Sequence, residues 1–194
     1  MPFTFEQTEI PDVILVTPAV FRDSRGYFFE SYRLSQFATG PIPTEFVQDN
    51  QSHSARGTIR GLHFQEGEFA QGKLVRCLQG EIWDVAVDIR PQSPTFGQWA
   101  ARTLSSDNRA MLYVPPGFAH GFQVVSATAE VFYKCTTEYA PRAEGGIVWN
   151  DADLALPWPV AEALVSEKDA RNLSFAQWRE RLKPGASVAS KEAR

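Results

Sequence analysis

The sequence holds few residues that can carry proton-transfer chemistry near neutral pH. Two of its three histidines stand in well-defined settings, His63 in TIRGLHFQ and His120 in VPPGFAHGF. A Pro-Pro-Gly turn at 115–117 precedes His120, and Gly57 stands shortly before His63, so both imidazoles are expected where the chain re-enters a sheet. Imidazole titrates near pH ~6.5, so each histidine could serve as a general base or as a metal ligand.

Polar side chains cluster around His63 in segments that otherwise resemble strands. They are Arg60, Gln65, Lys73, Arg76, Asp84 and Asp88. A core built only for stability would carry aliphatic residues there, so these positions indicate either a ligand-holding barrel interior or the solvent face of a sheet. We assign Arg76 and Asp88 to the solvent face, and His63 and Lys73 to a site.

The spacing of Arg60 and His63 sets a condition on that site. Residues three apart in a regular strand point to opposite faces. Both side chains can reach one cavity only if Gly61 marks a bulge or if Arg60 lies at the rim.

Short aromatic and β-branched runs broken by 13 Gly and 13 Pro favour strands throughout the chain. Expected strands cover residues 13–17, 27–32, 46–50, 58–64, 73–78, 82–89, 98–104, 111–114, 121–125, 130–136 and 146–149. The fold class predicted is an all-β sandwich or barrel. Only 34–38 and 175–182 are expected to be helical, the second with Ser174 and Gln177 in capping-box spacing and an apolar face for the barrel exterior.

The 194 residues fit a single domain over residues 1–184, followed by a small, polar tail over 185–194 that we expect to be disordered. A formal charge of −4 makes a nucleic-acid surface improbable, and no apolar run is long enough for a membrane span. Cys77 and Cys135 lack metal-site spacing and are predicted to be buried thiols. A cytoplasmic location is therefore expected.

The settings of His63 and His120 resemble the two signature stretches of the cupin superfamily, a small jelly-roll barrel. Metal-binding cupins carry a second histidine two residues after the first, and this chain has Gln65 there. An amide is a poor divalent ligand, so we interpret the barrel as metal-free. The alternative is a metal-dependent oxygenase whose ion is held by His63, His120 and a carboxylate such as Glu68.

A closer resemblance covers residues 3–180, in eight ordered blocks. They are FRDSRGYFFESY (21–32), FVQDNQSHSARGTIRGLHFQ (46–65), KLVRCLQGEIWDVAVDIRPQSPTFGQW (73–99), YVPPGFAHGF (113–122), VFYKCT (131–136), GIVWND (146–151), LPWP (156–159) and VSEKDA (165–170). In this order the blocks resemble the dTDP-4-dehydrorhamnose 3,5-epimerase family.

The resemblance implies a homodimer of cupin barrels that inverts carbons 3 and 5 of a dTDP-linked 4-keto-6-deoxyhexose without cofactor or metal. His63 matches the catalytic base and Asp169 its carboxylate partner. Lys73 matches the group that stabilises the enolate oxygen, and Tyr133 the acid on the opposite ring face. Matching sugar-nucleotide contacts are Gln48, Asn50, Arg60, His120, Tyr139, Glu144 and Lys168. Arg25, Phe28 and Glu30 lie in the segment that family members exchange with the partner subunit.

Other interpretations stay open at this stage. Without the resemblance, Asp169 is a helix cap after Ser166, and Tyr133 is core packing. Many family members have a tyrosine pair where this chain has Glu138 and Tyr139, which leaves open whether one carbon or both are inverted. A sugar-binding barrel without catalysis is the remaining alternative.

Overall fold

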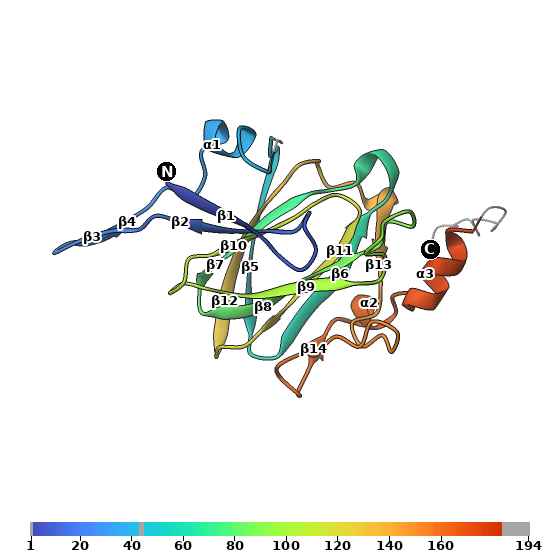
Figure 1. Ribbon diagram of the computed structural model, residues 1–194. Helices are drawn as coiled ribbons and strands as arrows, with labels where there is room; N and C mark the ends of the chain where they lie inside the picture. Colours follow the sequence, from blue (N-terminus) through green and yellow to red (C-terminus); the bar gives the residue numbers. More distant parts are fainter. Residues whose placement is uncertain (1, 43–44, 184–194) are drawn as a thin grey trace.

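Two antiparallel sheets pack face to face in the computed structural model, which describes residues 2–42 and 45–183 (Figure 1). The first sheet has the order β1 (Phe3–Gln7), β2 (Ile14–Pro18), β10 (Met111–Val114), β7 (Lys73–Gln79), β12 (Thr128–Cys135) and β5 (Gln48–Ala55). The second has β13 (Glu144–Gly146), β6 (Thr58–Gln65), β11 (Phe118–Val124), β8 (Glu81–Asp88) and β9 (Trp99–Ser105), and β14 (Leu164–Val165) pairs in parallel with β6. This architecture confirms the predicted all-β jelly-roll barrel.

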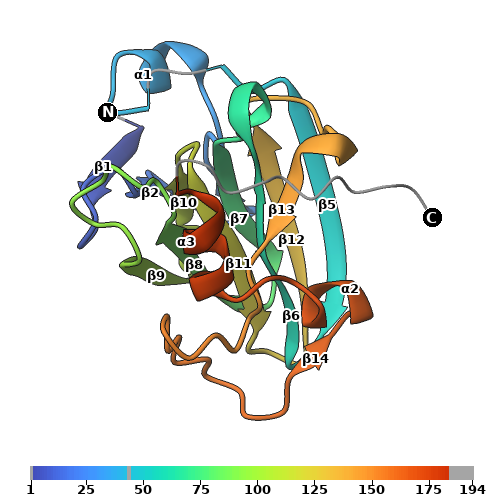
Figure 2. The ribbon, with the colours of Figure 1, turned by 90° about the vertical axis from the view of Figure 1, so that its right-hand side faces the viewer.

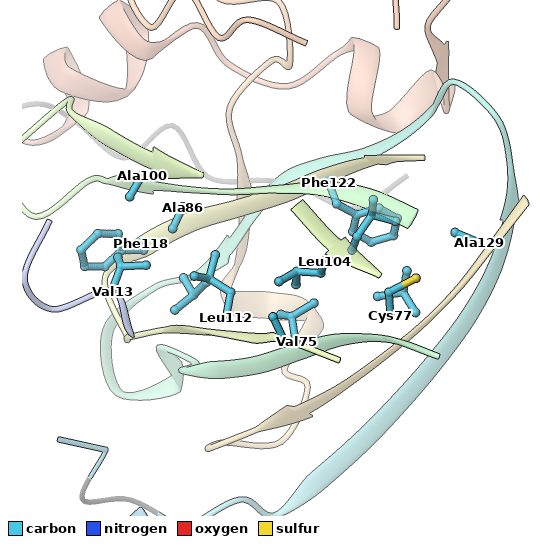
Figure 3. Close-up of a cluster of buried hydrophobic side chains, with 14 of the residues drawn as sticks. Val13, Val75, Cys77, Ala86, Ala100, Leu104, Leu112, Phe118, Phe122 and Ala129 are labelled. Atoms are coloured by element: carbon cyan, nitrogen blue, oxygen red, sulfur yellow. The ribbon is translucent and has the colours of Figure 1, made fainter. Parts of the chain in front are cut away.

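The main core lies between the sheets, because alternate residues of each strand point inward. Val75 and Leu112 come from the first sheet, and Phe118 and Phe122 face them from the second (Figure 3). Cys77 lies in the same cluster, and both cysteines are buried free thiols, as predicted.

Helices are short and lie outside the sheets. They are α1 (Leu34–Ala38), α2 (Glu167–Ala170) and α3 (Phe175–Arg181), with 3₁₀ turns η1 (Gly67–Phe69) and η2 (Pro141–Ala143). The expected capping box of Ser174 and Gln177 begins α3. Phe175 and Trp178 then bury one face of α3 against the outer side of the second sheet, which confirms the predicted exterior position (Figure 2). None of the helices in the described part of the chain is long and apolar enough to cross a membrane.

Several element boundaries differ from the prediction. Of the expected strand 27–32, only residues 27–28 are in a strand, within a hairpin of β3 (Phe21–Asp23) and β4 (Gly26–Phe28), and residues 29–32 are in none. β5 extends to residue 55, beyond the expected end at residue 50. The prediction stopped early because this edge strand consists mostly of polar residues, which hide the strand pattern. β11 starts at residue 118, directly after Gly117 makes the turn with a φ of 84°. β1 was not predicted, and the expected tail over 185–194 lies outside the described residues.

The solvent-face assignment of Asp88 is wrong. Its side chain is 0% exposed. The turn that follows β8 folds back and supplies its partners: Arg90 forms an ion pair with the carboxylate, and the hydroxyls of Ser93 and Thr95 donate to it at 2.5 and 2.6 Å. Burial opposes ionisation, but these donors hold the pKa of Asp88 down at about 2. The expectation missed this, because the compensating groups lie in a loop rather than in the strand pattern.

The strand β6 contains the irregularity that the spacing of Arg60 and His63 requires. His63 pairs with His120 and Arg60 with Phe122, so three steps along β6 match two along β11. Gly61 has a φ of 147°, and a Cβ there would lie 2.6 Å from the Cα of Gly121. Only glycine fits this close approach. The extra residue turns Arg60 toward the side of the sheet that His63 occupies.

Candidate active site

A cavity of about 270 Å³ opens at one end of the barrel, and both sheets contribute to its wall. Its lining combines an imidazole, an ammonium, two phenols and several amides, with little aliphatic surface. The lining residues are Gln48, Asn50, His63, Phe64, Gln65, Gln71, Lys73, Tyr133, Tyr139 and Glu144. Seven of these positions were predicted from the sequence as catalytic or substrate-binding.

His63 lies in the wall of this cavity with a carboxylate behind it. Its Nε2 is 2.6 Å from Oδ1 of Asp169, a residue 106 positions away in the chain. The His63 side chain is 33% exposed, and that of Asp169 is 6% exposed. Burial alone would raise the pKa of Asp169, but hydrogen bonds from His63 and from the Gly61 N–H hold it below its ordinary value. The pair therefore joins an accessible imidazole to a buried, ionised partner.

The position of Asp169 follows from the local sequence around α2. Ser166 caps this helix by accepting a hydrogen bond from the Asp169 N–H at 3.1 Å. The cap and the contact with His63 therefore coexist, since the backbone of Asp169 serves the first and its carboxylate the second. β14 pairs with β6 just before the cap, which brings α2 against the strand that carries His63.

Lys73 and Tyr133 lie together on the opposite wall, on the neighbouring strands β7 and β12. The Lys73 ammonium is 5.8 Å from the centre of the Tyr133 ring. Burial lowers the pKa of Lys73, against the opposing effect of negative groups that include Asp84. Burial raises the pKa of Tyr133, so its phenol keeps its proton well above neutral pH. The cavity thus holds a protonated phenol and the amine of Lys73 on the side facing the imidazole strand.

His120 was predicted to contact substrate, and the structure places it deeper, outside the lining of the cavity. Its side chain is 7% exposed, and its Nε2 is 2.9 Å from Oδ2 of Asp84, whose side chain is 0% exposed. Burial lowers the pKa of His120, against the charge of Asp84. Asp84 was noted only as a polar strand residue. The pairing of β8 with β11 brings Asp84 to His120, and the sequence pattern carries no signal of that pairing.

The rim of the cavity carries three of the predicted contact residues in one chain of interactions. The Tyr139 hydroxyl donates to Glu144 at 3.0 Å, and Lys168 forms an ion pair with the same carboxylate at 2.6 Å. Burial opposes ionisation of Glu144, but these two donors hold its pKa below the ordinary value. On the neighbouring wall, Gln48 donates to Asn50 at 3.0 Å.

Arg60 lies beside His63 in an adjoining hollow rather than in the cavity itself. This hollow also includes Lys168 and Asp169. The Nε of Arg60 donates to Ser54 Oγ at 3.0 Å, which leaves the outer end of its exposed guanidinium beside the entrance. Two cations, Arg60 and Lys168, therefore flank the imidazole on the solvent side.

The N-terminal candidates Arg25, Phe28 and Glu30 do not reach the cavity of their own chain. The β3–β4 hairpin projects away from the barrel (Figure 1). Phe28, which pairs with Phe21 in this hairpin, is 66% exposed. Arg25 forms an ion pair with Asp23 at 2.6 Å, and Glu30 pairs with Arg33.

The alternative metal centre lacks its third donor in the described part of the chain: His63 and His120 are neighbours across β6 and β11, but Glu68 is not grouped with them. His63 and His120 each have a separate aspartate partner, and Glu68 is exposed in η1. Among residues 2–42 and 45–183, no group of three or more His, Cys, Asp or Glu side chains is arranged to hold a metal ion. The side chains around His63 instead suit a polar organic ligand.

Comparison with known proteins gives a consistent result. Residues 7–177 match the family model described as dTDP-4-dehydrorhamnose 3,5-epimerase. The chain is 55% identical over 170 residues to the enzyme of that name from Pseudomonas aeruginosa, covering 86% of this chain and 93% of the relative. It is also similar to two solved structures. One is the Legionella pneumophila dTDP-6-deoxy-D-glucose-3,5-epimerase in complex with dTDP-4-keto-L-rhamnose (TM-score 0.85, 42% identity, 91% of this chain and 96% of that one). The other is a 3'-monoepimerase from Streptomyces bikiniensis in complex with dTDP-quinovose (TM-score 0.83, 30% identity, 88% and 87% covered).

Proposed function

Since the chain belongs to the dTDP-4-dehydrorhamnose 3,5-epimerase family, we propose that it converts dTDP-4-dehydro-6-deoxyglucose to dTDP-4-dehydrorhamnose by inverting carbons 3 and 5. The reaction is an isomerisation in which a proton leaves each carbon from one ring face and another arrives on the opposite face. The observation that carries this proposal is the placing of His63, Lys73 and Tyr133 around one cavity, with Asp169 behind the imidazole. No cofactor takes part in this scheme.

His63 is the base that removes the proton from the carbon next to the ketone. Its imidazole is accessible from the cavity, and imidazole is the side chain used most often as a general base. Asp169 holds one ring nitrogen, so the other is free to accept the proton, and its negative charge stabilises the imidazolium that forms. Positioned general-base catalysis contributes about 10²- to 10⁴-fold in rate.

Lys73 stabilises the enolate that the proton removal creates. The electron pair of the broken C–H bond moves into the ring, and negative charge collects on the oxygen of carbon 4. A buried ammonium interacts with such a charge more strongly than a solvated one, since little water screens it.

Tyr133 delivers a proton to the opposite face of the same carbon. Its raised pKa makes the phenolate a strong base, so it regains its proton from water readily after the transfer. The imidazolium of His63 loses its proton to water in the same way. Both groups then return to their starting states, and a shift of the ring allows the same pair to act on the second carbon.

The nucleotide part of the substrate occupies the rim. We propose that Arg60 and Lys168 pair with the diphosphate, that Phe28 of a second copy stacks on the thymine and that Tyr139 lies beside the nucleotide. The β3–β4 hairpin of a second copy completes the site with Arg25, Phe28 and Glu30 in an exchanged homodimer. The exposed aromatic residues of the projecting hairpin support this arrangement.

A cytoplasmic location accompanies this proposal. Both cysteines are buried free thiols, the state expected of a protein in a reducing compartment.

Incubation of the purified enzyme with the 4-keto sugar nucleotide in D₂O tests the reaction. NMR is expected to show deuterium at carbons 3 and 5, together with the rhamno-configured product. Label at one carbon only would indicate a single-site epimerase like the similar Streptomyces bikiniensis protein. Ligand binding without exchange at either carbon would instead identify a sugar-binding barrel.

A further inference from the structure

The loop of residues 138–140, which we call the Tyr139 loop, is held by two glutamine side chains from opposite sheets. The N–H of Tyr139 donates to Oε1 of Gln48 on β5 at 2.7 Å. The N–H of Ala140 donates to Oε1 of Gln65 on β6 at 2.7 Å. Residues 138–140 belong to no helix or strand. The backbone position of the Tyr139 loop therefore depends on these side-chain contacts.

Both ends of the Gln65 amide are engaged by backbone groups. Its Oε1 accepts from the Ala140 N–H, and its Nε2 donates to the carbonyl of Phe69 at 2.7 Å and to that of Glu138 at 3.3 Å. The residue is 6% exposed. Although Gln65 borders the cavity, its polar atoms join the Tyr139 loop to the 66–70 turn.

Tyr139 needs such support because its own side chain is little packed. Tyr139 is 51% exposed, and its hydroxyl donates to Glu144 on β13. An exposed ring gains little from burial, so the backbone must fix where it stands.

Glutamine at position 65 can hold the Tyr139 loop through three hydrogen bonds, and histidine cannot. A carboxamide offers two donors and an acceptor, which match two carbonyls and one N–H. A neutral imidazole offers only one donor and one acceptor. A histidine here could not make all three contacts, which gives a physical reason for glutamine where metal-binding cupins have their second histidine.

We propose that Gln65 is a positioning residue that sets the affinity for the nucleotide part of the substrate by fixing the Tyr139 loop. This inference rests on the proposed function, because it takes Tyr139 as a contact of the nucleotide. None of these bonds joins Gln65 to Asp169, Lys73 or Tyr133, so the proton transfers stay intact without it.

The test is Gln65→Met, which keeps the side-chain length but removes the three hydrogen bonds. We expect KM, and the Kd of dTDP alone by calorimetry, to rise about tenfold while kcat stays within about twofold. If this variant does not fold, Gln65→Glu keeps an acceptor for the Ala140 N–H, and a smaller rise in KM is expected.

Gln123→Met is the matched control. Gln123 is also buried in the second sheet and makes the same reciprocal contact with a loop, donating to the Val160 carbonyl at 2.8 Å and accepting from its N–H at 2.9 Å. This loop lies away from Tyr139. We expect Gln123→Met to lower thermal stability as Gln65→Met does, with KM unchanged.

A double-mutant cycle with Tyr139→Ala decides whether Gln65 acts through Tyr139. We expect Gln65→Met to change dTDP affinity less than twofold in the Tyr139→Ala background. A full tenfold effect there, or equal KM values for Gln65→Met and Gln123→Met, would overturn the assignment. Wild-type protein that binds dTDP but exchanges no proton would contradict the proposed reaction, while the cycle would still decide the role of Gln65.

Discussion

Two histidine–aspartate pairs lie side by side in this barrel, and they differ in access rather than in geometry. His63 and Asp169 are 2.6 Å apart, and His120 and Asp84 are 2.9 Å apart. The two histidines face each other across β6 and β11. Yet the His63 side chain is 33% exposed and that of His120 only 7%. The same residue types therefore give an accessible base in one case and a sealed internal contact in the other.

The source of each carboxylate explains the difference. Asp84 comes from β8 within the same sheet as His120, so both members face the barrel interior. Asp169 comes from α2 outside the sheet and approaches His63 from behind, which leaves the ring open to the cavity. Access for substrate thus depends on a helix of four residues placed by the β14–β6 pairing.

Replacing each histidine in turn gives the largest expected contrast. We expect His63→Asn to lower kcat/KM by about 10²- to 10⁴-fold and to abolish deuterium uptake in D₂O, because the base is lost. His120→Asn is expected to lower activity far less but to reduce thermal stability, since it leaves Asp84 buried with a poorer partner. Equal losses of exchange in the two variants would contradict the division of roles.

Replacing the carboxylates sharpens the same contrast at a smaller scale. We expect Asp169→Asn to lower kcat by about 10- to 100-fold with little change in KM, because the imidazole remains but loses the partner that sets its tautomer. Steady-state kinetics together with a thermal melt provide the measurement. A large fall in stability with unchanged kcat would assign Asp169 to the helix cap alone.

The pH dependence of activity tests the influence of Asp84 on Lys73. Because burial depresses the pKa of Lys73, its ammonium is lost at a lower pH than that of an ordinary lysine. The pKa of Tyr133 is raised, so the phenol is still protonated in that range. The alkaline fall of kcat/KM is therefore assigned to Lys73. Asp84 opposes the depression, so Asp84→Asn is expected to move this fall to lower pH.

Asp88→Asn is the control for that pH profile. It also removes a buried carboxylate from β8, but the partners of Asp88 are Arg90, Ser93 and Thr95, away from the cavity. Its alkaline limb is expected to match that of the wild type. A shift as large as that of Asp84→Asn would mean that the effect is not specific to the neighbourhood of Lys73.

The sequence predicts the parts of the site that depend on local pattern. Lys73 stands at the start of its strand and His63 near the end of its own, and glycine at position 61 already indicates the bulge that brings Arg60 to the same side. Ser166 and Asp169 have cap spacing that the structure retains. These features need only neighbouring residues to specify them.

The remaining features depend on contacts between distant segments, which local pattern does not encode. The partner of His63 is 106 residues away, and the expectation for it came from family resemblance. The depth of His120 follows from strand order, which periodicity alone does not give. The prediction placed Asp88 on the solvent face because the sequence of its strand does not indicate that Ser93 and Thr95 of the next turn donate hydrogen bonds to it. The strand expected at 27–32 is wrong. The β3–β4 hairpin forms a separate two-stranded sheet, so no larger sheet requires its apolar and polar residues to alternate.

The stability of the Asp88 variant gives the smallest expected effect. A carboxyl whose pKa falls from 3.8 to about 2 on folding stabilises the native state above pH 3.8, and this contribution is lost as the pH falls toward 2. We expect Asp88→Asn to reduce the free energy of unfolding by about 2 kcal/mol at pH 7, because each pKa unit is worth about 1.4 kcal/mol. Urea denaturation at pH 7 and near pH 3 measures it, and the difference from the wild type should shrink at the lower pH. A difference independent of pH would mean that Asp88 acts through packing rather than through its charge.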